Sequence, residues 1–328
     1  MLDTLVQLGV NWIVAIQSLG GWPEAPMEFF SFLGSENFFF LTLPLIYWSI
    51  NARLGLQVAA ILIASNSLKP VFKMFFAGPR PYWVSSRVNP FVAEGSFGIP
   101  SGHAQDAAAL WGIMASGARK RWAWIAAVAL AFLVGFSRLY LGVHFVHDVL
   151  AGWLIGGVLL WAFLRFWDPA TAWLQTKSFG RQVLIAFLLS LLVVTLGALV
   201  VRHLDGYTFP DEWRENALRA GELPDPVSMD GTLASAGTLF GLAVGAAWLA
   251  PRGGYQASGP VAKRALRYVI GLIGILLFWK GLDFMFPSGE DFIGFLFRYL
   301  RYLLVGLWIS AGAPYLFFHF KLADKPKM

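Results

Sequence analysis

Residues 182–201 read QVLIAFLLSLLVVTLGALVV, and no charged side chain lies between Arg181 and Arg202. A run of about 20 apolar residues is long enough to cross the hydrocarbon core of a bilayer as an α-helix. This stretch therefore predicts a transmembrane helix, and it sets the fold class that the rest of the chain has to match.

The whole chain has the same character. Of its 328 residues, 57% are hydrophobic and 13% are charged, whereas soluble domains carry about 25% charged residues. We expect an all-α, polytopic membrane helix bundle with about nine spans. The predicted spans lie near residues 30–50, 54–76, 101–117, 122–140, 147–167, 181–202, 232–250, 266–286 and 292–319.

The N-terminal segment differs from these spans. Residues 2–18 mix Leu, Val, Trp and Ile with polar side chains, which predicts an interfacial helix that lies on the membrane. We expect no cleavable signal peptide, because a basic start is missing and Asp3 stands in its place. Residues 1–328 are expected to form a single membrane-embedded domain, with a motif-bearing core at 54–167 and additional C-terminal helices at 181–320.

Basic residues in the short loops predict the orientation, because cytoplasmic loops are enriched in Lys and Arg. This rule places the N-terminus and the three motifs described below outside, and the C-terminus in the cytoplasm. The opposite loops carry many acids, such as Glu94, and the acidic segment 203–231 either caps the outer mouth of a site or connects two spans. The predicted cytoplasmic residues are Arg53, Arg119, Lys120, Arg121, Arg165, Lys177, Arg181, Arg252, Lys263, Arg264, Lys321, Lys325 and Lys327.

Two classes of function are disfavoured by composition. The chain has no cysteine, which excludes disulfides and sites built on cysteine. Its net charge of +6 comes from scattered loops and forms no basic stripe, so we expect no nucleic-acid partner.

Three short clusters of polar residues stand at the ends of apolar segments. Charge at such places is costly in a membrane and therefore marks functional candidates. The clusters are Lys73…Arg80-Pro81, Pro100-Ser101-Gly102-His103 and Ser137-Arg138…His144…Asp148.

These residue types suit the transfer of a phosphoryl group. Lys73 supplies a point charge, and Arg80 and Arg138 supply planar forks for oxyanions. The turn at Ser101 and Gly102 opens a predicted helix, whose free N–H groups bind anions.

Two histidines, His103 and His144, can divide the roles of nucleophile and proton donor. A nucleophilic imidazole needs its attacking nitrogen unprotonated, and a carboxylate on the other nitrogen achieves this. Asp148 lies four residues after His144, which suits such a contact if the turn is helical.

The pattern Lys-x6-Arg-Pro, Pro-Ser-Gly-His and Ser-Arg-x5-His-x3-Asp resembles the type 2 phosphatidic acid phosphatase superfamily at every motif position. The resemblance implies hydrolysis through a phosphohistidine, without a metal or another cofactor. It makes His144 the nucleophile, Asp148 its partner, and His103 the general acid and later the base. The residues that it implies for binding phosphate are Lys73, Arg80, Ser101, Gly102 and Arg138.

A wider resemblance concerns the substrate. The segments 71–73, 80–83, 137–147 and 237–242, and the layout of spans, resemble glucose-6-phosphatases. That family has Gln where this chain has Asp148, and lipid phosphatases have Asp. We therefore expect a phosphorylated lipid as substrate and membrane lipids as partners, with a sugar phosphate as the alternative.

A third class of function is an inert or transport-type membrane protein that retains the fold. The complete set of motif residues argues against this class, because an inert relative is expected to have lost at least one of them.

Two further residues have simpler interpretations. Lys69 lies one helical turn before Lys73 and is expected to extend its ammonium group toward the membrane surface. Asp106 lies three residues after His103, where it either tunes that histidine or favours the helix N-terminus.

Overall fold

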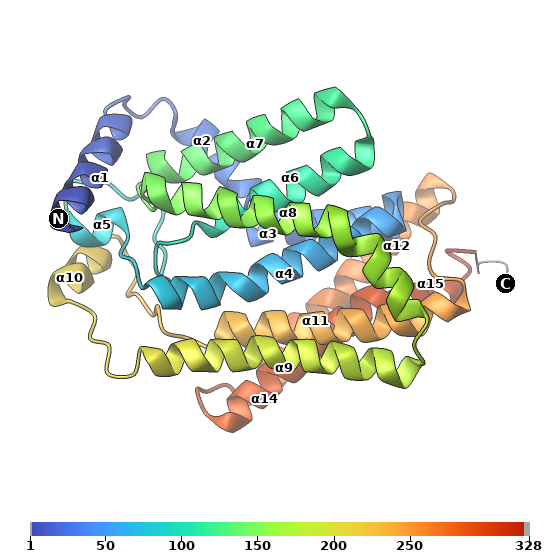
Figure 1. Cartoon of the computed structure of the whole chain (residues 1–328). Helices are drawn as coiled ribbons and strands as arrows, with labels where there is room; N and C mark the ends of the chain where they lie inside the picture. The colour runs from blue at the N-terminus through green and yellow to red at the C-terminus, as the bar shows by residue number, and fades with distance from the viewer. Residues whose placement is uncertain (1, 325–328) are drawn as a thin grey trace. The chain divides into compact units, whose positions relative to one another are not determined.

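A computed structural model describes residues Leu2–Asp324, and these residues form helices and loops without any β-strand (Figure 1). The all-α class is confirmed. Lys325 and Lys327, part of the predicted cytoplasmic set, lie outside the described residues.

The helical elements follow one another along the chain from α1 to α15. They are α1 Leu2–Gln17, α2 Glu24–Phe32, α3 Glu36–Leu45, η1 Ile46–Ile50, α4 Ala52–Phe76, α5 Pro81–Val84, α6 Gly102–Ala118, α7 Arg121–Tyr140, α8 Val146–Gln175, α9 Phe179–His203, α10 Asp211–Arg219, α11 Asp230–Leu249, η2 Ala250–Arg252, α12 Val261–Leu276, η3 Leu277–Gly281, α13 Leu282–Met285, α14 Phe292–Leu307, η4 Trp308–Gly312 and α15 Ala313–His319.

The chain is a multi-pass membrane protein. Among the described residues, seven helices are long and apolar enough to cross a membrane, or eight if α2 and the α3–η1 segment form one bent span. The predicted span at 101–117 corresponds to α6, which has 17 residues and is shorter than any of these seven helices. The total of nine spans stays a prediction.

The predicted span at 30–50 is interrupted. Helix α2 ends at Phe32 and α3 begins at Glu36. A Cβ atom on Gly34 would lie 2.6 Å from Val134 Cγ1, so a side chain at this position would clash. The hydroxyl of Ser35 accepts a bond from the N–H of Phe38 at 3.3 Å, as an N-cap residue does. The break therefore arises from a close approach and a new helix start.

Residue contacts divide the described chain into two compact units, and the predicted single-domain organisation stays a prediction. The first unit comprises residues 1–38, 68–161 and 199–228. Helices α6 and α7 lie side by side in it, and α2 packs on α7. Gly152 and Gly156 of α8 approach the backbone of α6 so closely that a Cβ atom at either position would meet it.

Helix α1 belongs to this first unit. Val10 and Ile13 are fully buried in its core cluster, whereas Leu8 and Trp12 are exposed. The predicted helix is confirmed, and its place at the membrane surface stays a prediction.

Of the described residues, the second unit comprises 39–67, 162–198 and those from 229 onward. Helices α11 and α14 lie side by side, because a glycine spacing of four residues on α11 lets the backbones meet. A Cβ atom on Gly237 would clash with Tyr299 O, and one on Gly241 with Leu303 O.

This second unit also holds a buried arginine. The Arg267 guanidinium donates to the Tyr255 hydroxyl at 2.9 Å and to the carbonyl oxygens of Ala257 and Ser258, both at 3.0 Å. Its side chain is fully buried. Arg267 therefore ties α12 to the loop that precedes it.

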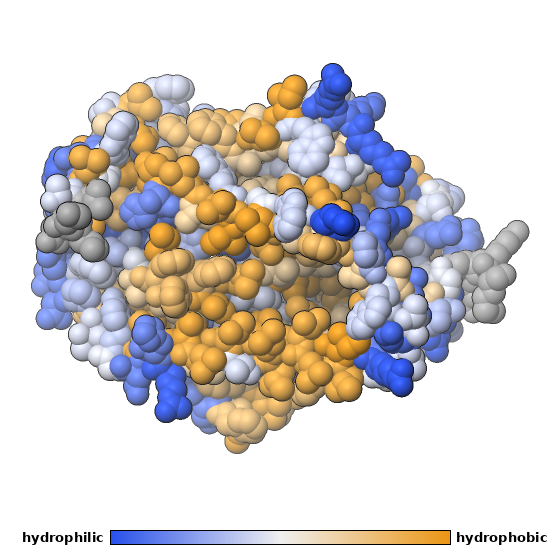
Figure 2. All heavy atoms as spheres, in the orientation of Figure 1, coloured by the Kyte–Doolittle hydropathy of each residue, from blue (hydrophilic) through white to orange (hydrophobic). Residues whose placement is uncertain are grey.

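The outer faces of single helices match a lipid environment. On α8, the exposed side chains include Leu150, Leu154 and Val158, and on α9 they include Leu184 and Leu188. Figure 2 shows apolar side chains in orange over these two helices. Apolar surface of this kind is expected where helices face hydrocarbon.

Candidate active site

The structure brings the three polar clusters together within the first unit. Each residue stands at the end of a helix or in the loop beside it. Lys73 lies in the last turn of α4, Arg80 directly before α5, Ser101 at the N-cap of α6, Gly102 and His103 in the first turn of α6, Arg138 in the last turn of α7, His144 between α7 and α8, and Asp148 in the first turn of α8.

His144 and Asp148 are in contact and almost completely buried. His144 Nδ1 lies 3.3 Å from Asp148 Oδ2, and this oxygen also accepts the N–H of Phe145 at 2.9 Å. Phe145 directly precedes α8, so Asp148 reaches back to the N-cap position as the acid of a capping box does. The contact was predicted for a helical turn, but the helix begins only at Val146, and the start of α8 sets the geometry instead.

The other ring nitrogen of His144 faces Arg80. His144 Nε2 lies 3.4 Å from Arg80 Nη1, and a guanidinium group can only donate. We therefore infer that Nε2 is unprotonated and that Nδ1 carries the hydrogen toward Asp148. Burial lowers the pKa of His144 well below its ordinary value, and the positive charges of Arg80 and Lys73 lower it further. The imidazole is thus neutral at pH 7.

Segment 96–97 holds two of the cations. Arg80 Nε donates to Ser96 O at 2.6 Å, and Arg80 Nη2 donates to Ser96 Oγ at 3.1 Å. Lys73 Nζ donates to Phe97 O at 2.5 Å and to Ser96 Oγ at 3.2 Å. These bonds place Lys73 and Arg80 beside each other despite their equal charge.

Glu94 is the residue of this site that the sequence analysis missed. Its Oε2 lies 2.9 Å from Arg80 Nη2, and its Oε1 pairs with Arg138 Nη2. Burial raises the pKa of Glu94, but Arg80, Arg138 and the two histidines outweigh this effect and hold the pKa well below its usual range. Only its position between the first two motifs could have drawn attention to it.

His103 shares this electrostatic environment. It lies half-buried in the first turn of α6, and both His103 and His144 contribute to lowering the pKa of Glu94. Both histidines therefore lie within electrostatic range of the same carboxylate.

A backbone bond joins the second and third motifs. Ser101 N donates to Asp148 O at 2.9 Å. The Ser101 hydroxyl accepts from Ala104 N at 3.5 Å, as the N-cap of α6. The start of α6 and the start of α8 are thus fixed to each other.

The prediction for Lys69 is wrong. Its ammonium group does not extend to the surface but lies 2.9 Å from the buried carboxylate of Asp106. It also lies 3.5 Å from a carboxylate oxygen of Glu36. Asp106 therefore has a third role, which sequence reasoning did not consider. The ion pair with Asp106 on a neighbouring helix is therefore more favourable than hydration of the Lys69 ammonium group at the surface.

His147 contacts the same aspartate as His144. Its Nε2 lies 3.2 Å from Asp148 Oδ1, and its side chain is 61% exposed. The carboxylate of Asp148 thus lies between one buried and one exposed imidazole.

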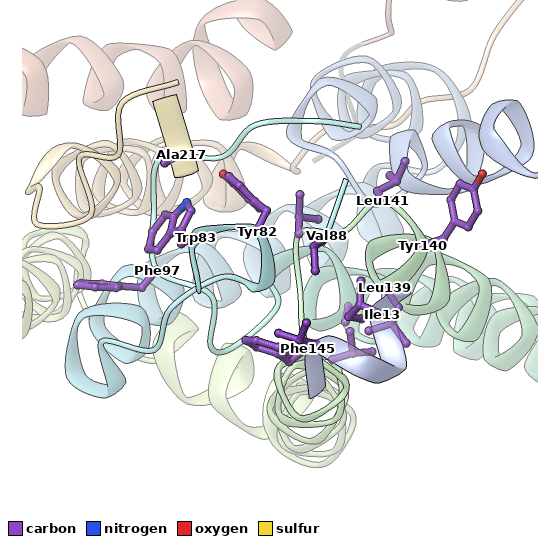
Figure 3. Close-up of a cluster of buried hydrophobic side chains, with 14 residues drawn as sticks. Ile13, Tyr82, Trp83, Val88, Phe97, Leu139, Tyr140, Leu141, Phe145 and Ala217 are labelled. Atoms are coloured by element: carbon purple, nitrogen blue, oxygen red, sulfur yellow. The ribbon is translucent and has the colours of Figure 1, made fainter. Parts of the chain in front are cut away.

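The acidic segment 203–231 packs on the first motif. The rings of Trp83 and Phe209 lie 5.1 Å apart, and Asn216 Nδ2 donates to Trp83 O at 3.0 Å. Figure 3 shows Trp83 between Ala217 of α10 and Phe97. Most of this segment, residues 204–228, therefore belongs to the first unit and is more than a solvated connector.

Profiles of known protein families match two parts of this chain. A profile of the PAP2 superfamily matches residues 54–172, and a profile described as PAP2 superfamily phosphatase, transmembrane extension, matches residues 233–325. Together they span more than half of the chain. The chain belongs to the PAP2 superfamily. The first of the two matches contains every motif residue of this PAP2 protein.

Several individual proteins are similar to it. Glucose-6-phosphatase 3 of Homo sapiens is 32% identical over 49% of this chain and 53% of its own length. Phosphatidylglycerophosphatase B of Bacillus subtilis is 35% identical over 35% of this chain and 58% of its own length. The PAP2 protein thus spans little more than half the length of these two curated relatives.

A longer match exists at lower identity. Glucose-6-phosphatase 2 of Homo sapiens is 24% identical over 93% of this chain and 94% of its own length. Among solved structures, a transmembrane PAP2-type phosphatidylglycerolphosphate phosphatase from Bacillus subtilis is 26% identical, covers 51% of this chain and 88% of its own, and has a TM-score of 0.45.

Proposed function

We propose that the PAP2 protein is an integral-membrane phosphatase that hydrolyses phosphomonoesters through a phosphohistidine on His144. The observation that carries this proposal is the position of the His144 imidazole, whose Nδ1 lies 3.3 Å from Asp148 Oδ2 and whose Nε2 lies 3.4 Å from Arg80 Nη1. An oriented, unprotonated nitrogen next to a fixed guanidinium is what attack on a bound phosphate requires.

The reaction has two balanced steps. In the first, the Nε2 lone pair attacks phosphorus, the P–O ester bond breaks, and His103 gives a proton to the leaving oxygen. In the second, His103 takes a proton from water, the oxygen of the water attacks phosphorus, and the P–N bond breaks. Inorganic phosphate leaves, and both imidazoles return to their first state.

Side chains and backbone amides would hold the phosphoryl group without a metal. Lys73, Arg80 and Arg138 supply three positive charges. Ser101 and Gly102 supply donors at the N-terminus of α6, where backbone N–H groups favour anions. Preorganised donors of this kind stabilise the charge that develops in the transition state.

The proposed substrate is a lipid phosphate. Exposed apolar side chains of α8 start at Val146, directly beyond the nucleophile, and continue through Leu150 and Leu154. Acyl chains lying along this face would bring a headgroup close to His144. The similarity to a phosphatidylglycerophosphatase supports this choice.

A sugar phosphate is the second candidate. The alignment with glucose-6-phosphatase 2 extends over 93% of the chain, and segment 204–228 packs aromatic residues beside the first motif.

A substrate panel tests both candidates. The purified protein should hydrolyse phosphatidate or another lipid phosphate in mixed micelles faster than glucose 6-phosphate, and excess chelator should leave the rate unchanged. Much faster turnover of glucose 6-phosphate would reverse the substrate assignment while the catalytic roles stand. Activity that chelator removes and magnesium or zinc restores would overturn the metal-free mechanism.

We also propose that the site faces the extracytoplasmic side, with the N-terminus outside and the C-terminus in the cytoplasm. The distribution of Lys and Arg among the loops supports this orientation. Intact cells that express the protein should hydrolyse a membrane-impermeant aryl phosphate, and cells with His144→Ala should not. Hydrolysis only after lysis would place the site on the cytoplasmic side.

A further inference from the structure

Two buried arginines of the site share one carboxylate. Arg80 and Arg138, which we call the arginine pair, both contact Glu94. The side chains of Arg80 and Arg138 are 0% and 2% exposed, whereas that of Glu94 is 23% exposed. Of these three side chains, the carboxylate is therefore the one that solvent reaches.

This arrangement conflicts with phosphate binding. A phosphoryl group needs the same guanidinium donors that Glu94 occupies, because carboxylate and phosphate oxygens bind a guanidinium fork in the same way. Arg80 Nε donates to Ser96 O and Nη1 donates to Val143 O, while Nη2, which faces Glu94, also donates to Ser96 Oγ and Phe97 O. Substrate therefore competes with Glu94 for Nη2 of both arginines.

We propose that Glu94 is a built-in competitor for the phosphate position, displaced when substrate binds and returning to the arginine pair when inorganic phosphate leaves. This inference rests on the proposed function and adds a residue that acts on the binding and release of phosphate. The carboxylate also offsets part of the positive charge of the two buried guanidinium groups in the resting protein, and unpaired buried charge is costly.

The local backbone indicates how the carboxylate moves. The Tyr82 hydroxyl accepts the N–H of Glu94 at 2.9 Å and donates to its carbonyl oxygen at 3.0 Å. The backbone of Glu94 is therefore held on both sides, and displacement requires rotation of the side chain alone. The pairing persists at ordinary pH, because the pKa of Glu94 is well below its usual range.

Competition of this kind lowers the apparent affinity for any oxyanion. The apparent affinity is proportional to the fraction of molecules in which Glu94 has left the arginine pair. Substrate and product are affected alike. The expected benefit is release, because the returning carboxylate replaces bound phosphate and limits product inhibition.

Direct binding of inorganic phosphate tests the proposal. In the full-length protein in detergent, Glu94→Gln should bind phosphate at least about tenfold tighter than wild type, because an amide pairs weakly with guanidinium. The matched control is Glu222→Gln, since the carboxylate of Glu222 lies against Gly95 but touches neither arginine in the described contacts. Its affinity for phosphate should stay within twofold of wild type.

Equal or weaker binding by Glu94→Gln would overturn the proposal and make Glu94 a residue that positions the arginines. If this variant does not fold, Glu94→Asp replaces it. The shorter carboxylate of Asp cannot bridge both guanidinium groups, so the Glu94→Asp protein should bind phosphate more tightly than wild type. Unchanged or weaker binding by this variant would also overturn the proposal. The binding experiment measures no turnover. A failure of the phosphatase assignment would therefore be seen in a different experiment, the substrate panel, where the wild-type protein would hydrolyse nothing.

Discussion

Arg138 in the first unit and Arg267 in the second are both buried, yet their partners differ in kind. Arg267 donates to two backbone carbonyl oxygens and a tyrosine hydroxyl in its own unit. Arg138 donates to the Ser31 hydroxyl at 2.5 Å and to the carboxylate of Glu94. Carbonyl oxygens of an ordered loop stay in place, whereas a carboxylate at the end of a side chain can rotate away.

The difference separates a structural charge from one that can exchange its partner. A buried guanidinium that backbone dipoles satisfy contributes to the fold, and losing those bonds leaves polar groups unpaired. A guanidinium paired with a partly exposed carboxylate can accept another anion in its place. The type of partner is therefore a better guide to function than burial alone.

Removing His144, the proposed nucleophile, should have the largest effect on activity. His144→Ala should lower kcat by about 10⁴-fold or more, since the covalent pathway is closed. The free energy of unfolding should fall by about 1–3 kcal/mol, because truncating a buried imidazole leaves a cavity and removes a partner of the buried carboxylate of Asp148. Steady-state kinetics and thermal unfolding provide the two readouts.

His203→Ala, at the exposed end of α9, is the control and should match wild type in both readouts. Activity of His144→Ala within tenfold of wild type would remove the assignment of the nucleophile.

Exchanging each arginine for lysine tests the comparison itself. Arg138→Lys should lower kcat/KM by about 10²–10³-fold, the usual loss for one donor to a transition-state oxyanion, with little change in the unfolding midpoint. Arg267→Lys should leave kcat/KM within about threefold, and it should cost about 1–3 kcal/mol of stability because carbonyl oxygens lose their donors.

The two arginines differ as described only if Arg138→Lys loses mainly activity and Arg267→Lys loses mainly stability. If both variants lose stability and keep activity, or if both lose activity alone, the kind of partner does not distinguish the two arginines.

The pH profile should show the smallest effect. Burial, Arg80 and Lys73 hold the pKa of His144 well below its ordinary value of 6.5. The nucleophile is therefore neutral above its lowered pKa, and acidification protonates it only below that point. We expect the acid limb of the kcat/KM profile to lie below pH 6.5. A limb at or above pH 6.5 would show that the charges near His144 do not act as described.

Much of this protein could be predicted from its sequence for two physical reasons. Long apolar runs have few alternatives to a membrane helix, so among the described residues seven of the nine predicted spans correspond to helices long and apolar enough to cross a membrane. The motif residues stand at helix ends, and helix ends next to a membrane surface gather at one level. The contact between His144 and Asp148 followed from a spacing of four residues, although His144 lies before the first residue of the helix.

The remaining features depend on contacts that spacing does not encode. Glu94 lies in a segment without helical or strand periodicity, so nothing in the sequence pointed it toward Arg80 and Arg138. The ammonium group of Lys69 was predicted to reach the membrane surface. Its partner, Asp106, lies on another helix, and the spacing of residues in the sequence does not reveal that contact. The interruption of the first span depends on a close approach at Gly34.

The bond from Ser101 N to Asp148 O also has a consequence for synthesis. A ribosome adds about 5–20 residues per second, so Asp148 is made about 2 to 10 s after the amide that it will bind. During this interval the residues of α6 are completed, but its first turn lacks the acceptor that later fixes it. The bond that fixes the start of α6 to the start of α8 can therefore form only after residue 148 has been made.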